Sequence, residues 1–129
     1  MSLDYLTPSK ESHPISLEKA VEMTKIYREN RSAILKEEYQ FKNILALSET
    51  FNRDAVLALL QQKNCNAFRI YYGMSDDFNV HAILVGVNEK GEDILPATST
   101  IGMAEGYGDI LEDALRCPTA CPPESPLNS

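Results

Sequence analysis

The stretch from residue 67 to residue 95 constrains the fold more than any other part of this sequence. In AFRIYYGM at 67–74, Phe68, Ile70 and Tyr72 alternate with Arg69 and Tyr71. After the turn-forming SDDF, the segment NVHAILVGVN is rich in β-branched residues on both faces. Alternation with period two predicts a strand, and a strand apolar on both faces is typical of the middle of a sheet. With the turn NEKGED and the apolar pair at 94–95, the stretch predicts a three-stranded antiparallel meander.

Two segments that precede this meander have helical spacing instead. Apolar residues recur every three to four positions from Ser16 to about residue 30, and Ser16 suits an N-cap. Asn52 similarly caps a second predicted helix at 53–63. Residues 31–51 fit either further helix or an irregular connection. The chain therefore predicts an α+β fold in which N-terminal amphipathic helices pack on a three-stranded antiparallel meander.

The remaining segments complete the predicted domain organisation. With 129 residues, the chain has the size of one domain. We expect a flexible N-terminal arm at 1–14, a single α+β domain at 15–116 and a Cys/Pro-rich tail at 117–129, whose last segment, PPESPLNS, is expected to be mobile. Within the domain, residues 97–109 are small, polar and glycine-bearing, which predicts a long loop. The following DILEDALRC predicts two turns of amphipathic helix.

Composition limits the classes of partner and compartment. Nineteen acidic residues against twelve basic ones give a net charge of -7, which repels nucleic acid and anionic membranes. The charge suits a basic partner or serves only to keep the protein soluble. The sequence has no apolar run of about 18 residues and no signal-peptide pattern at its start. Three cysteines are too few for a secreted disulfide scaffold, so we expect a cytoplasmic protein.

The cysteines are the first candidate site. Cys117 and Cys121 have a C-x3-C spacing that occurs in zinc sites, and with Cys65 they could hold a metal. A structural zinc site takes four ligands, which leaves His13 or His81 for the fourth. A disulfide between Cys117 and Cys121 requires a tight turn, because an extended chain separates their α-carbons by about 13 Å. A redox pair normally begins a helix, whereas these cysteines follow one, so the sequence favours two reduced thiols.

A second candidate site lies on the predicted meander. The hairpin brings His81 beside Arg69 and Tyr71, with Tyr72 next to them. Such a group could bind an anionic ligand or supply an acid and a base, provided that the register brings the side chains to one face. The alternative is a structural histidine flanked by aromatic residues. No nucleophile is spaced to join the group, so the sequence favours a protein that is not an enzyme.

The chain also resembles a known group of sequences. The segments ISLEKA, FNRDAVLALLQQKNCNAFRIYYG and HAILVGVNEKGEDI, followed by a glycine-bearing loop and a Cys-Pro-rich end, are similar to a group of small uncharacterised bacterial proteins known mainly as hypothetical proteins. The resemblance covers residues 15–121. Members of that group tend to end in CPP followed by a second cysteine, whereas this chain has CPTACPP. The resemblance implies a bacterial source and no particular activity.

Together these observations predict a small, non-enzymatic binding or protein-interaction module. The segment AFRIYYGM is a candidate edge strand with Tyr71 exposed, and unpaired strand edges favour association, so a homodimer is expected. The alternative is a metal-site or redox-site protein that uses Cys65, Cys117 and Cys121, with zinc as the metal. In neither case do we expect nucleic acid or a membrane as partner.

Overall fold

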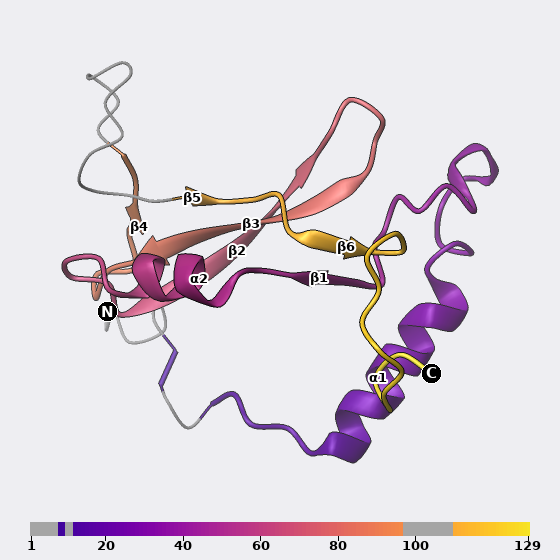
Figure 1. The fold of residues 1–129 in the computed structure, drawn as a ribbon, viewed down its shortest axis with the longest axis horizontal. Coiled ribbons are helices and arrows are strands. Elements are labelled where there is room, and N and C mark those ends of the chain that lie inside the picture. The colour runs from indigo at the N-terminus through magenta and orange to yellow at the C-terminus, as the bar shows by residue number, and fades with distance from the viewer. Residues whose placement is uncertain (1–7, 10–11, 97–109) are drawn as a thin grey trace. The chain divides into compact units, whose positions relative to one another are not determined.

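A computed structural model describes residues 8–9, 12–96 and 110–129 of the chain. It confirms the predicted α+β class, with antiparallel strand pairs and two α-helices. Figure 1 shows the elements, which are α1 (Leu17–Asn30), a short 3-10 helix (Glu37–Tyr39), β1 (Ser48–Thr50), α2 (Arg53–Leu60), β2 (Ala67–Met74), β3 (Val80–Val87), β4 (Asp93–Ile94), β5 (Ile110–Leu111) and β6 (Leu115–Cys117). The predicted loop at 97–109 and most of the predicted arm lie outside the described residues.

The contacts divide the chain into two compact units, each built from segments distant in sequence. Unit 1 contains α2, β4, β5 and most of β2 and β3. Unit 2 contains α1, β1, β6 and the turn that joins β2 to β3. The two predicted helices thus belong to different units, and α2 is the one in the unit that contains β4, β5 and most of β2 and β3.

The sheet of unit 1 has four strands, so the predicted three-stranded meander is incomplete. β3 has β2 on one side, and β4 and β5 both pair antiparallel with it (Figure 1). β4 pairs with Gly86 and Val87, and β5 pairs with Leu84 and Val85. Two strands of two residues each thus pair with successive parts of β3. The predicted helix at 109–117 is wrong, because its residues form β5 and β6 instead.

The second half of β3 is buried, and α2 contacts β5, which pairs with this half of β3. The side chains of Leu84, Val85 and Val87 are 5% exposed or less, and Leu59 of α2 is completely buried. Asn52 caps α2 as predicted, with its Oδ1 accepting hydrogen bonds from two backbone N–H groups. The helix ends at Leu60, three residues before the predicted end, where the chain tightens into a turn that brings residues 62 and 65 against Gly86.

In unit 2, α1 is tied to the segment that precedes β1. Ser16 caps the helix, its Oγ accepting from the N–H of Lys19 at 3.0 Å. Further along, Tyr27 Oη donates to the carbonyl of Ala46 at 2.6 Å, and Arg31 donates to the carbonyl of Leu45. These long-range hydrogen bonds fix residues 45–46 against the helix, and β1 begins directly afterwards.

The C-terminal tail is part of unit 2, and its first residue, Cys117, belongs to β6. β6 pairs antiparallel with β1, with Ser48 opposite Cys117. Beyond β6, Arg28 of α1 donates to the carbonyl oxygen of Leu127 at 2.9 Å and to an oxygen of Ser129, the last residue of the sequence, at 2.7 Å. The tail is held because its backbone oxygens are acceptors for an arginine on a helix 99 and 101 residues earlier.

The described part of the chain contains no candidate for a membrane-crossing helix, by length and hydropathy taken together.

Candidate functional site

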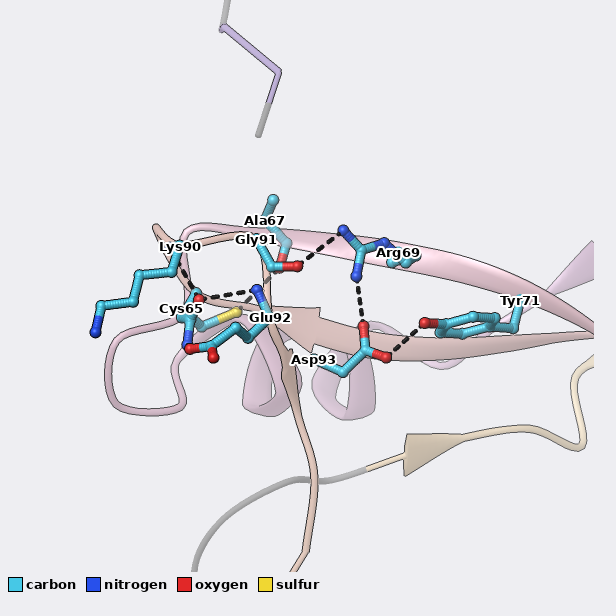
Figure 2. A network of polar contacts seen from close by, with 9 residues as sticks. Cys65, Ala67, Arg69, Tyr71, Lys90, Gly91, Glu92 and Asp93 are labelled. Atoms are coloured by element: carbon cyan, nitrogen blue, oxygen red, sulfur yellow. Dashed lines mark hydrogen bonds and ion pairs between the residues drawn. The ribbon is translucent and has the colours of Figure 1, made fainter. Parts of the chain in front are cut away.

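The predicted pair Arg69 and Tyr71 meets at a residue that the sequence did not single out, Asp93. Arg69 Nη1 donates to Asp93 Oδ1 at 2.6 Å, and Tyr71 Oη donates to Asp93 Oδ2 at 2.5 Å. Arg69 also donates to the carbonyl of Gly91 at 3.2 Å. Figure 2 shows the guanidinium and the phenol converging on the carboxylate from β2. Because β3 separates β2 from β4 in the sheet order, these contacts join two strands that are not neighbours.

The electrostatics of this cluster oppose the predicted anion site and the predicted acid–base site. The hydrogen bond to Asp93 raises the pKa of Arg69, so its charge is permanent and is already paired with a carboxylate. The same carboxylate raises the pKa of Tyr71, because the phenol donates to it in the neutral form. The cluster therefore holds a neutralised arginine and a protonated tyrosine, an arrangement suited to joining strands.

The third member of the predicted group, His81, lies in unit 2 at the start of β3. Its charge acts on Asp77, which lies in the turn between β2 and β3. The pKa of Asp77 is lowered chiefly because the Ser75 hydroxyl donates to it, and His81 adds a smaller lowering effect. The structure thus brings Arg69 and Tyr71 together in unit 1, whereas His81 belongs to unit 2.

The cysteine pair is oxidised in the structure. Cys117 and Cys121 form a disulfide with their α-carbons 4.4 Å apart, so the expectation of two reduced thiols is wrong. The tight turn that such a disulfide requires is present here, because the N–H of Ala120 donates to the carbonyl of Arg116 at 2.8 Å.

The predicted zinc site gains no support from this geometry. A disulfide sulfur is no longer a thiolate, and thiolates are what a zinc site requires. Cys65 is a free cysteine in unit 1, where its thiol donates to the carbonyl of Ala67 at 3.2 Å (Figure 2). Within residues 8–9, 12–96 and 110–129, no three or more His, Cys, Asp or Glu side chains are grouped to hold a metal ion.

The most exposed apolar feature of unit 1 lies on β2. We call its residues Phe68, Ile70 and Tyr72 the β2 row, since alternate positions of a strand lie on one face. Their exposed fractions are 47%, 45% and 79%. β2 is at the end of the sheet order, with β3 as its described neighbour. The alternation that predicted the strand also places these three residues on one face, and in the structure all three are open to solvent.

Comparisons with known proteins add no relative. No family model, no curated protein and no solved structure matches this chain. The resemblance to the group of small bacterial proteins stays a prediction.

Proposed function

We propose that this chain is a non-enzymatic protein-interaction module that associates with a second copy of itself through the β2 row. The observation that supports this most is the exposure of three large apolar side chains on an edge strand. Exposed apolar patches in soluble proteins typically mark interaction surfaces. An edge strand adds unpaired backbone groups to the same surface.

The charge distribution on β2 favours a second copy as the occupant. Arg69 is the one charged residue of the strand, and Asp93 neutralises it. Edge strands that are protected from association usually carry lysine or proline, and β2 has neither. Two β2 rows brought together therefore bury apolar surface without burying an unpaired charge, whereas a basic partner would find no acidic group in the row.

The size of the β2 row sets the expected strength of association. At about 200 Å² for each large side chain, the exposed fractions amount to roughly 350 Å² per chain, against roughly 800 Å² per partner in a standard interface. Each copy also carries a net charge of -7, so the copies repel each other. We therefore expect a weak, reversible dimer that salt strengthens, because salt screens the repulsion.

Sedimentation equilibrium tests this proposal over protein concentrations from about 10 μM to about 1 mM, the range suited to a weak dimer. We expect the average mass to rise with concentration toward that of a dimer, and Tyr72→Lys to keep the protein monomeric. The matched control is Phe41→Lys, at a phenylalanine that is 86% exposed in unit 2.

Both substitutions reduce the net negative charge by one, which by itself favours association. If Tyr72→Lys loses the dimer and Phe41→Lys keeps it, the loss is therefore caused by the change in the β2 row and not by the change in charge. A wild-type protein that stays monomeric throughout, or equal behaviour of the two variants, would contradict the proposal.

The disulfide supports a second candidate function, a redox-responsive tail. In forming the bond, the Cys117 and Cys121 thiols each give up a proton and an electron to a disulfide oxidant such as oxidised glutathione, which is reduced to two thiols. Equilibration with glutathione buffers of graded ratio, followed by thiol counting, tests it. One free thiol in oxidising buffers and three in reducing buffers supports this function, and a pair that stays bonded in every buffer opposes it.

A further inference from the structure

Unit 2 contains a cavity that has no part in either function proposed above. It has a volume of about 280 Å³ and lies among α1, β1 and the C-terminal tail. The apolar part of its wall includes Leu47, Pro122 and Leu127. All of the lining residues belong to unit 2, so one compact unit supplies the complete wall. Concave, mainly apolar cavities with a few polar groups are the usual form of small-molecule sites.

Most polar side chains in this wall are already hydrogen-bonded within unit 2. The hydroxyls of Thr24 and Tyr27 each donate to a backbone carbonyl, at 3.0 and 2.6 Å. In the tail, the side-chain oxygens of Ser125 and Asn128 each accept from a backbone N–H, at 3.2 and 2.8 Å. A ligand would gain little from these four groups, because each would have to exchange an existing hydrogen bond for a new one.

The positive charge in the wall is offset as well. Arg28 is the one charged side chain among the described residues that line the cavity. It donates to the carbonyl of Leu127 at 2.9 Å and at 2.7 Å to an oxygen of Ser129, the last residue, where the chain end is a carboxylate. An ion in the cavity would therefore lose its hydration without gaining an unpaired opposite charge, so the cavity favours an uncharged ligand.

The polar group of the wall that is left for a ligand is the hydroxyl of Ser48. It is buried, and the described structure gives it no hydrogen bond. Ser48 lies opposite Cys117 in the pairing of β1 with β6, and both residues line the cavity, so their side chains share the face of this strand pair that is turned toward it. Buried hydroxyls normally have a partner, and a serine hydroxyl can both donate and accept. It is therefore suited to pair with a hydroxyl group of a ligand.

From these features we infer that the cavity is a binding site for a small uncharged alcohol with an apolar body. The hydroxyl of the ligand forms a hydrogen bond with the Ser48 hydroxyl, while the apolar body lies against Leu47, Pro122 and Leu127. If each heavy atom occupies about the 30 Å³ of a water molecule, the cavity holds roughly nine heavy atoms. 1-Octanol has that size and serves as the probe.

The first experiment compares three probes of equal chain length by calorimetry with the full, oxidised chain. We expect 1-octanol to bind saturably with one molecule per chain. Octanoate and octylammonium carry opposite charges, and both should bind at least about tenfold more weakly, because the wall offers neither of them an unpaired counter-charge. In a nuclear magnetic resonance titration of the wild type, the amide signals of Leu47, Ser48 and Leu127 should shift with octanol.

The second experiment tests the hydroxyl of Ser48 with a pair of variants. Ser48→Ala removes the hydroxyl that has no partner, so it should fold normally and weaken octanol binding about fivefold, as expected for the loss of one hydrogen bond. Thr50→Val is the matched control, because it removes a hydroxyl from an exposed residue of the same strand outside the cavity wall. It should leave octanol binding unchanged.

Four results would overturn the inference: no saturable octanol binding, a charged probe that binds as tightly as octanol, equal effects of Ser48→Ala and Thr50→Val on octanol binding, or octanol-induced shifts confined to unit 1. Thermal unfolding checks that each variant is folded, and the titration of the wild type locates the site without any variant. Because the β2 row lies in unit 1, these results do not depend on whether the chain dimerises.

Discussion

Breaking the disulfide between Cys117 and Cys121 should destabilise the protein by an amount set by the short loop that it closes. The two cysteines are separated by four positions, so the closed loop has few residues. The chain-entropy relation for such a loop gives about 2 kcal/mol of stabilisation, roughly a 30-fold change in the unfolding equilibrium constant. For a chain of 129 residues this corresponds to about 7 °C in the midpoint of thermal unfolding.

Urea unfolding of the wild type, with and without a dithiol reductant, measures this difference. Cys121→Ser should have the stability of the reduced wild type and should not respond to the reductant, which controls for effects of the reductant at Cys65. A loss below about 0.5 kcal/mol would refute the reasoning, because the disulfide would then not restrict the unfolded chain. A loss far above the predicted value would instead show that β6 unpairs from β1 on reduction.

Three further predictions concern single side chains. A Cβ at Gly73 would lie 2.7 Å from Ile83 Cδ1, so Gly73→Ala should cost about 1–3 kcal/mol in urea unfolding, and adding Ile83→Val, which removes that methyl group, should recover most of it. Asp93 raises the pKa of Tyr71 above 10.0, so the stability from this hydrogen bond is present below about pH 10 and is lost as pH rises through the raised value. The difference in unfolding free energy between wild type and Tyr71→Phe should therefore shrink in that range, and a constant difference would contradict the assignment. Ser48→Ala should leave the stability unchanged or raise it by up to about 1 kcal/mol, since the hydroxyl that it removes is buried without a partner; a clear loss in thermal unfolding would show that the hydroxyl is bonded.

The features predicted well from the sequence are those with local signals. The caps at Ser16 and Asn52 marked the starts of α1 and α2, because a cap depends on residues two or three positions away. Period two marked β2 and β3, which have eight residues each. β4 and β5 have two residues each, too few for a period to be visible, so their pairing with β3 was not predicted in full.

The candidate site depended on contacts that local patterns do not encode. Arg69 and Tyr71 were identified as a pair, but their common partner Asp93 is 24 and 22 positions away, and only the register of β4 on β3 brings it near. The disulfide was missed for a similar reason. The spacing of Cys117 and Cys121 allows both an extended and a turned segment, and the turn follows from the hydrogen bonds around β6.

The account rests most on the association of two copies through the β2 row, and a dilution series followed by nuclear magnetic resonance tests it most directly. On dilution from about 1 mM to about 20 μM, the range for a weak dimer, the amide signals of β2 should shift, with the largest changes near Phe68, Ile70 and Tyr72. Rotational diffusion should become faster over the same range. Signals of β2 that are independent of concentration, or shifts confined to unit 2, would contradict the account.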